Sequence, residues 1–395
     1  MLTEIKVNNF KCFKEDVVFP VGKLTLLTGV NGKGKSTVVQ TLLLIAQSLH
    51  ESGEYSTLHL NSFLADLGSF DDIRSTGSSS SSTISFRLLF EKNDKYLYWD
   101  TKFSRSYLDE KSGSVENEGI LNLDSSHISG SDIENSDIGT LNLKKYLERI
   151  DTNPLKEYVS NFEELSFISA DRMGPKTFHE SKLNSLFSVG KNGENTALTI
   201  YKYRELEVIE SLRLDVGTTV LLADQVSAWV SYIFNSGTIN IESISETLKK
   251  IEISPDGSIH NYKPENVGYG FSYCLPIIVA GLTSKPGDIL IVENPEAHLH
   301  PSAQNRITKF LCRLASAGIT TIVETHSPSI LNGVRLSIKD NILNSSDTSV
   351  LFFGENSASE DQVERIIIED GGVVNHWPKG FFDQDEIDLD NLYGL

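Results

Sequence analysis

The sequence predicts an α/β fold with a central parallel sheet, an N-terminal antiparallel part and an inserted, mainly helical region. Near the N-terminus a strand runs into a glycine-rich turn and then a long apolar helix, and from residue 267 onward strands and helices alternate. Alternation of this kind is typical of a parallel sheet, because each crossover between parallel strands needs a connection about as long as a helix.

The chain has 395 residues, a length that allows two or three folding units. Hydrophobic residues make up 39% and charged residues 23%, which excludes general disorder, collagen and a coiled-coil rod. With 54 acidic and 35 basic residues the formal net charge is −19, which argues against a chain that coats nucleic acid unaided. Three widely spaced cysteines favour a reducing cytoplasm, and no apolar run approaches the roughly 20 residues of a membrane span.

The N-terminal part is predicted to be mostly β-structure up to residue 105. The expected strands are 4–10, 16–19 and 23–28, a helix follows at 36–50, and a hairpin joins 83–91 to 95–103 through Asn93-Asp94. The serine run 78–82 is expected at a loop tip, and the Ser/Gly/Asp-rich segment 106–140 is expected to be a flexible polar insertion.

A mainly helical insertion is expected from 141 to 265, with a strand at 165–172 and helices at 141–150, 195–235 with breaks, and 243–251. A C-terminal lobe from 266 to 345 then contains helix 272–282, strand 288–292, helix 301–317 and strand 319–324. The last part, 346–395, is expected to hold two short strands within 349–369 and to end in an acidic tail.

The turn Gly29–Ser36 has the spacing GxxxxGK[ST] between a strand and a helix, which is the context that a phosphate loop requires. Glycines let backbone N–H groups surround phosphate oxygens, Lys35 brings a charge to the β- and γ-phosphates, and Ser36 offers its hydroxyl to Mg²⁺. A simple glycine turn needs neither that lysine nor that serine. The residues expected to hold ATP here are Asn31, Gly32, Lys33, Gly34, Lys35, Ser36 and Thr37.

Two later segments supply further candidate residues. The apolar strand that ends at Glu293 can deliver a carboxylate to the metal, so Glu293 and Ser36 are the candidate Mg²⁺ ligands. His326 follows the next strand and can report whether the γ-phosphate is present.

These segments together carry a family resemblance. IKVNNFKCF, LTLLTGVNGKGKST, ENPEAHLHP and ETHSP resemble the ATP-binding-cassette ATPases of the SMC, RecF and overcoming-lysogenization-defect group. VGYGFSYCLPI, FISADRMGP, VGKNGEN and WPKGFFDQ resemble a subfamily of prokaryotic AAA-type ATPases of uncharacterised function, frequently encoded beside defence genes.

The resemblance implies that two ATPase heads enclose two nucleotides, each phosphate loop facing the partner's signature segment. Carried onto this chain, Gly268, Gly270 and Ser272 occupy the signature position at the start of a helix. The family's usual signature serine falls at Gly268, so either Ser272 or backbone donors would have to replace it.

A second departure concerns the residue that polarises the attacking water. The related pattern is Asp-Glu-Pro, whereas this chain has Asn294 before Pro295, and an amide cannot take up a proton. Glu296 is the nearest replacement carboxylate, and slow hydrolysis is expected. His298 and His300 resemble the family's element at the head–head interface; the alternative is that they start a helix.

Other singled-out residues have two open interpretations each. Arg172 either contacts a phosphate or partner or is a solvated or ion-paired residue, and Lys11 either lies near the nucleotide or is a surface lysine. The rings of Trp377–Phe382 are expected to pack as a C-terminal clasp, and the acidic tail is expected to be solvated, with docking on a basic partner as the alternative.

The leading functional hypothesis is a Mg²⁺-dependent ATPase whose dimer or larger homo-oligomer controls a separate effector, a nuclease or toxin, in prokaryotic antiviral defence. The defence role is implied by the resemblance alone. One alternative is a scaffold that binds nucleotide without hydrolysis, favoured by Asn294, and another is a RecF-like DNA-repair head, which would contact nucleic acid. A membrane partner is not expected.

Overall fold

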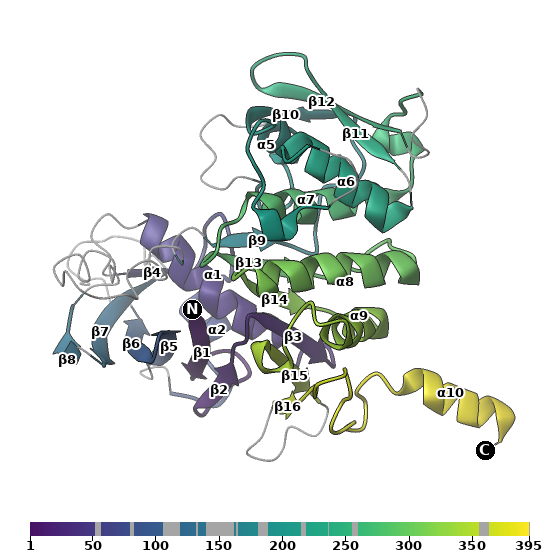
Figure 1. The fold of residues 1–395 in the computed structure, drawn as a ribbon. Coiled ribbons are helices and arrows are strands. Elements are labelled where there is room, and N and C mark those ends of the chain that lie inside the picture. The colour runs from purple at the N-terminus through teal and green to yellow at the C-terminus, as the bar shows by residue number, and fades with distance from the viewer. Residues whose placement is uncertain are drawn as a thin grey trace. The chain divides into compact units, whose positions relative to one another are not determined.

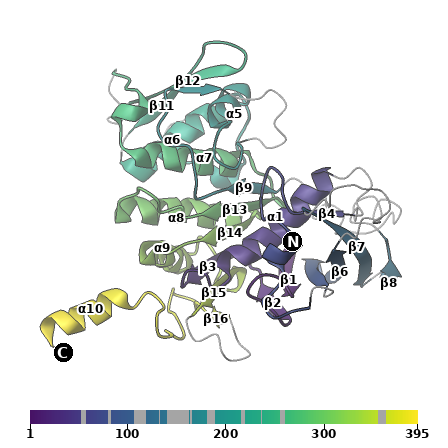
Figure 2. The same ribbon diagram turned by 180° about the vertical axis from the view of Figure 1, so that it is seen from behind.

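The computed structural model describes residues 1–51, 57–79, 83–105, 119–131, 133–139, 162, 165–180, 189–214, 219–235, 237–254, 260–354 and 363–394. Figures 1 and 2 show the ribbon from opposite sides. The chain divides into two compact units, which are described separately: unit 1 comprises Met1–Gly22, Gly29–Leu165 and Leu351–Glu364, and unit 2 comprises Lys23–Thr28, Ser166–Val350 and Arg365–Leu395.

Unit 1 contains an antiparallel sheet with the order β2-β1-β5-β6-β7-β4, and β8 pairs with β7. Buried and exposed residues alternate along its strands, as expected for a sheet with one face packed on the core. The predicted hairpin is confirmed, because Asn93 and Asp94 both have positive φ, which a tight primed turn requires. The strands are β1 (Leu2–Asn8), β2 (Val17–Pro20), β4 (Thr57–His59), β5 (Ile84–Lys92), β6 (Lys95–Arg105), β7 (Ile120–Gly130) and β8 (Ile133–Asp137).

Helix α1 (Lys35–Glu51) is joined to the edge of this sheet by side-chain hydrogen bonds. The amide nitrogen of Gln47 donates to the carbonyl oxygen of His59 at 2.7 Å, and the backbone N–H of His59 donates to the Ser48 hydroxyl at 2.8 Å. Most of α1 is buried, which confirms the predicted buried helix. Helix α2 (Phe70–Ile73) is a single turn further along unit 1.

The prediction of an irregular insertion from 106 to 140 was wrong for residues 120–137, which form β7 and β8. Leu121, Ser126 and Ile128 of β7 are buried, and the strand pairs with β6 along most of its length. Long-range pairing therefore overrides a composition that is typical of loops. Residues 106–118, 80–82 of the serine run and the predicted helix 141–150 lie outside the described residues.

Unit 2 contains parallel strands in the order β3-β14-β13-β9, as the alternation of strands and helices predicts. Helix α8 provides the crossover from β13 to β14, and α7 precedes β13. The full sheet continues beyond β3 through β15 to β16. The elements are β3 (Leu24–Gly29), β9 (Ser166–Ile168), α7 (Tyr269–Thr283), β13 (Ile289–Glu293), α8 (Pro301–Ser316), β14 (Thr320–Glu324), α9 (Pro328–Lys339), β15 (Thr348–Phe353) and β16 (Glu364–Ile366).

A second, antiparallel sheet of unit 2 has the order β10-β12-β11 and lies beside α5 and α6 at the top of Figure 1. The predicted helix 243–251 was wrong, because these residues join β11 to β12. Apolar residues recur at every second position, Ile239 and Ile241 in one strand and Ile251 and Ile253 in the next, which is a strand period. The elements are β10 (Phe178–Glu180), α5 (Thr196–Lys202), α6 (Leu222–Phe234), β11 (Thr238–Ser243) and β12 (Leu248–Ser254).

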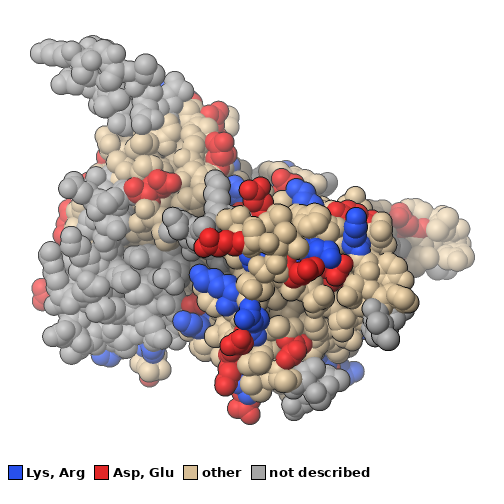
Figure 3. Space-filling model, turned by 90° about the horizontal axis from the view of Figure 1, so that it is seen from above, with Lys and Arg blue, Asp and Glu red and all other residues tan. Residues whose placement is uncertain are grey.

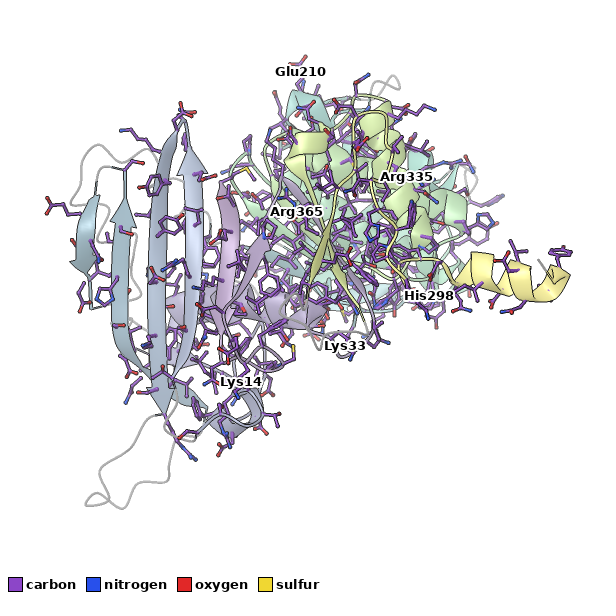
Figure 4. The ribbon with its side chains drawn as sticks, turned by 90° about the horizontal axis from the view of Figure 1, so that it is seen from below. Lys14, Lys33, Glu210, His298, Arg335 and Arg365 are labelled. Carbon is purple, nitrogen blue, oxygen red and sulfur yellow. The ribbon has the colours of Figure 1, made fainter. Side chains whose placement is uncertain are left out.

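The C-terminal part confirms the two predicted short strands and contains ring contacts among the predicted aromatic residues. Phe381 is fully buried, and its ring lies 5.2 Å from that of Trp377 and 5.0 Å from that of Phe382. Arg335, labelled in Figure 4, lies over the Trp377 ring at 5.6 Å and so connects the aromatic group to α9. The acidic tail forms helix α10 (Gln384–Tyr393). Among the described residues, no helix has the length and hydropathy needed to cross a bilayer.

Candidate functional site

The turn after β3 has the backbone of a phosphate loop. Lys35 is 3% exposed, and its ammonium group donates to the carbonyl oxygens of Gly29 and Val30, both at 2.9 Å. These two bonds curl the turn around the lysine side chain. The backbone N–H of Thr37 donates to the Gly34 carbonyl at 3.0 Å, so the turn passes directly into α1.

Two glycines of the turn are required by close packing within unit 1. A Cβ on Gly29 would lie 2.3 Å from the carbonyl oxygen of Phe353, and one on Gly34 would lie 2.3 Å from the Phe13 ring. Both residues have positive φ, at 124° and 110°, which disfavours any side chain. Gly32 also has positive φ, with open space around it, so its backbone can be approached closely by a ligand.

The remaining residues of the turn differ in exposure. Asn31, Gly32 and Ser36 are exposed, Lys33, labelled in Figure 4, is half-buried, and Thr37 is buried. Ser36 lies at the start of α1 and is an exposed residue. Lys11 is half-buried rather than free at the surface, because its ammonium group donates to the Gln40 side chain on α1 at 2.5 Å. Burial lowers the pKa of Lys11.

The parallel pairing in unit 2 brings three functional segments to one edge of the sheet. β14 pairs with β3 on one side and with β13 on the other, so the carboxyl ends of all three strands lie at the same edge. The backbone N–H of Thr325 donates to the Leu27 carbonyl at 3.0 Å, and the N–H of Asn294 donates to the Glu324 carbonyl at 2.8 Å. The phosphate loop follows β3 directly in the chain.

Glu293 is the last residue of β13, and its half-buried carboxylate is held in place by a hydrogen bond. Its Oε2 atom accepts a hydrogen bond from the backbone N–H of Ala170 at 3.0 Å. Burial raises the pKa of Glu293, and the Ala170 N–H and the nearby charge of Arg172 oppose that rise. A buried carboxylate with few partners is well suited to receive a cation.

Glu296 lies in the turn after β13 and contacts the loop after β14. Its Oε1 atom accepts from the backbone N–H of His326 at 2.8 Å, whereas its Oε2 atom is buried with no hydrogen-bond partner among the described residues. Burial raises the pKa of Glu296. The structure therefore brings Glu296 and His326, two separately predicted residues, together; the His326 side chain itself is exposed.

Arg172 is neither solvated nor ion-paired in the described structure. It is 3% exposed, and its guanidinium donates to the carbonyl oxygens of Glu293 at 2.9 Å and Asn294 at 2.5 Å. Burial lowers the pKa of Arg172. Asn294 has φ of 43°, a left-handed conformation that asparagine tolerates better than most residues. Arg172 thus stabilises a tight turn at the end of β13.

The start of α7 exposes a tyrosine rather than a serine. Gly268 precedes the helix and is exposed, while Tyr269 is 54% exposed in the first turn. Gly270 is buried, and a Cβ there would lie 2.9 Å from the His298 carbonyl oxygen. Ser272 is half-buried and lines a small internal cavity together with Gly174.

His298 and His300 have different surroundings. His298, labelled in Figure 4, is exposed, has φ of 60°, and its ring lies 4.5 Å from the Tyr273 ring and 5.3 Å from the Tyr269 ring. His300 caps α8, because its side chain accepts from the backbone N–H of Ser302 at 3.3 Å. The helix-start interpretation therefore describes His300 and not His298.

The sequence analysis missed Tyr269 and Tyr273 as contact residues of this site. Their spacing of four places them on one face of a helix, and that signal was available in GYGFSYC. It also missed Ala170, whose contribution is a backbone N–H and so leaves no side-chain signal.

The donor chemistry of the predicted metal ligands fits Mg²⁺. A serine hydroxyl and a carboxylate supply oxygen atoms, and Mg²⁺ commonly takes one or two such protein ligands together with waters and substrate phosphates. Ser36 is an exposed residue, and the Glu293 carboxylate is held by the Ala170 N–H and the Ser169 hydroxyl.

Comparison with protein families identifies the class. A model described as AAA ATPase domain matches residues 1–331, and a family of proteins of unknown function (DUF3696) matches residues 343–392. The first match covers most of the chain, which therefore belongs to the AAA ATPase domain family. This confirms the expected ATPase class.

A curated relative and two solved structures are similar to the chain. The OLD nuclease of Thermus scotoductus is 22% identical over 344 residues, which are 83% of this chain and 59% of the nuclease, so the chain spans less than two thirds of that relative. The SMC head domain from Thermotoga maritima has a TM-score of 0.47 at 13% identity and covers 93% of this chain and 99% of that chain. An Smc head domain with an extended coiled coil, bound to the C-terminal domain of ScpA from Pyrococcus furiosus, has a TM-score of 0.43 at 10% identity and covers 99% of each chain.

Replacement of Lys35 by alanine is expected to weaken ATP binding about 10- to 100-fold, the range that corresponds to one or two lost charged hydrogen bonds. Lys33→Ala is the matched control, because Lys33 lies in the same turn but holds neither loop carbonyl that Lys35 binds. Titration of each variant with a fluorescent ATP analogue measures the affinities. Equal affinity in the wild type and Lys35→Ala would reject the phosphate-loop assignment.

Proposed function

We propose that this protein is a Mg²⁺-dependent ATPase that dimerises with nucleotide, hydrolyses it slowly and controls a separate effector protein in prokaryotic antiviral defence. The observation that carries the proposal is the order β3-β14-β13 in unit 2, which gathers the strand leading into the phosphate loop, the Glu293 strand and the His326 loop at one sheet edge. Ligands of open α/β sheets bind at that edge.

The phosphate loop is proposed to hold the triphosphate through the backbone N–H groups of residues 31–36 and the Lys35 ammonium group. Lys35 is already held close to the loop by two carbonyl oxygens, and its positive charge would attract a phosphate bound there. Ser36 and Glu293 would hold Mg²⁺, which neutralises phosphate charge when bound. The glycine conformations at 29, 32 and 34 keep the loop open for this contact.

Glu296 is proposed as the general base in place of the asparagine at 294. Its Oε2 atom is buried with no hydrogen-bond partner among the described residues, so it could accept a proton from a water admitted beside it. Burial raises the pKa of Glu296, which makes it a stronger base than an exposed glutamate. Asn294 contributes its backbone to the turn instead. This observation favours slow hydrolysis over the non-hydrolysing scaffold.

Dimerisation and effector control are proposed from the family resemblance and from the exposed start of α7. Gly268 and Tyr269 are exposed there, where free N–H groups of a helix N-terminus attract a phosphate. The nuclease or toxin step is proposed for a separate effector protein.

Direct, RecF-like DNA binding receives less support. Figure 3 shows acidic side chains interspersed with Lys and Arg on the face in view, without an extended basic surface among the described residues. The formal net charge of −19 also disfavours binding to nucleic acid.

Glu293→Gln is expected to weaken the Mg²⁺ dependence of nucleotide binding, because the amide removes a negative charge from the metal site. Binding of an ATP analogue is measured across a Mg²⁺ titration, with Glu265→Gln as a control on an exposed glutamate of the same unit. An unchanged titration in Glu293→Gln would remove this residue from the metal site.

The rate of ATP hydrolysis is expected to depend on pH through the protonation of Glu296. A general base must be deprotonated, so turnover falls as pH drops through its pKa, and burial places that acid limb above the ordinary glutamate value of 4.5. Glu296→Gln should lower kcat about 100-fold or more. Phosphate release at a series of pH values measures both effects.

Asn294→Asp distinguishes hydrolysis with Glu296 as the general base from a scaffold that binds nucleotide without hydrolysis. Aspartate is chosen because it also tolerates the positive φ at this position, whereas glutamate would add backbone strain. A wild type that releases no phosphate, together with an Asn294→Asp variant that does, would favour the scaffold and contradict the assignment of Glu296.

ATP is expected to convert the monomer to a dimer or larger assembly, and the assembly is expected to retain a partner from the native host. Native mass measurement of the purified complex with and without ATP, using Lys35→Ala as the nucleotide-binding control, tests both statements. An unchanged mass with ATP bound would contradict the dimerisation proposal.

A further inference from the structure

Arg172 carries a buried charge with an unusual set of partners. Its two terminal nitrogens donate to the carbonyls of Glu293 and Asn294, its Nε atom is buried without a hydrogen-bond partner, and no carboxylate lies within ion-pair distance among the described residues. Such a charge is costly to bury unless other groups compensate it. The Tyr273 ring contributes to this compensation, with the guanidinium carbon 5.4 Å from the ring centre, and the nearby carboxylates of Glu296 and Glu293 also favour the charge.

Tyr273 contacts two parts of the same turn. The face of its ring lies against Arg172, which holds the backbone of residues 293 and 294, and the His298 ring lies 4.5 Å away at an interplanar angle of 64°. Asn294 and His298 are both non-glycine residues with positive φ, so this turn is held in a conformation that an isolated peptide would disfavour. Contacts from α7 are therefore required to maintain it.

We propose that Tyr273 is a positioning residue for turnover: through Arg172 it holds the Glu293–Asn294 backbone, and through that turn it sets the position of the Glu296 carboxylate. The proposal rests on the proposed ATPase function. Tyr273 touches no reacting group itself. The nucleotide is bound by the phosphate loop, so loss of this contact affects the catalytic step and not affinity.

The test compares two substitutions of Tyr273 in the full-length chain. Tyr273→Leu removes the ring that contacts Arg172, and Tyr273→Phe keeps the ring and removes the hydroxyl. Tyr273→Leu is expected to lower kcat about tenfold with KM within about twofold, the loss that corresponds to one buried cation–π contact. Tyr273→Phe should restore wild-type kcat.

Hydrogen exchange supplies a second readout that does not need activity. The backbone N–H groups of Asn294, Ala297 and Leu299 bond to carbonyls of β14 and of the turn itself. Tyr273→Leu is expected to speed exchange across 294–299 while α8 and α9 stay protected, and Tyr273→Phe is expected to leave exchange unchanged. Unchanged exchange in Tyr273→Leu, or a loss of kcat in Tyr273→Phe equal to that in Tyr273→Leu, would overturn the proposal.

If Tyr273→Leu does not fold, Arg172→Lys provides a second test of the same contacts. A lysine lacks the planar guanidinium that donates to two carbonyl oxygens at once. Faster exchange at 294–299 in Arg172→Lys supports the proposal, and wild-type exchange contradicts it. If the wild type does not hydrolyse ATP, the proposed hydrolysis is rejected. The exchange measurements then still decide whether Tyr273 and Arg172 hold the turn.

Discussion

The parallel pairing of β14 with β3 and β13 is the constraint on which the rest of the site depends. Backbone hydrogen bonds fix the register of the three strands, so residues distant in sequence end at one edge of the sheet. Two further bonds, from Thr325 to Leu27 and from Asn294 to Glu324, extend this order into the loops. Each functional segment then needs only short local contacts to be positioned.

Burial around the turn after β13 gives its polar groups their chemical character. The carboxylates of Glu293 and Glu296 have raised pKa values because burial disfavours their charged forms, and the buried guanidinium of Arg172 partly opposes this effect. An exposed Glu-Asn-Pro-Glu turn would have ordinary carboxylates. The same burial requires close packing, which explains why Gly270 sits against the His298 carbonyl.

Much of the fold could be predicted, because its main signals are local. The hairpin around Asn93 and Asp94 and the alternating strands and helices after residue 267 follow from periodicity and turn chemistry. The two failures have different causes. The polar strand at 120–130 is stabilised by pairing with β6, which its composition does not show, whereas at 243–251 the period-two spacing of the isoleucines was present in the sequence and was missed. A serine-rich strand and a serine-rich loop have similar local sequences.

The sequence by itself determined the residue types of the candidate site: a glycine turn with Lys35 and Ser36, an acid at Glu293 and an amide at Asn294. The tertiary structure alone decided that Arg172 binds backbone carbonyls, that Glu296 lies against the His326 loop, and that Tyr273 covers the guanidinium. Residue types and short spacings determine what a group can do. Its partners and burial depend on contacts between segments that are 30 to 121 residues apart in these cases, which no local pattern encodes.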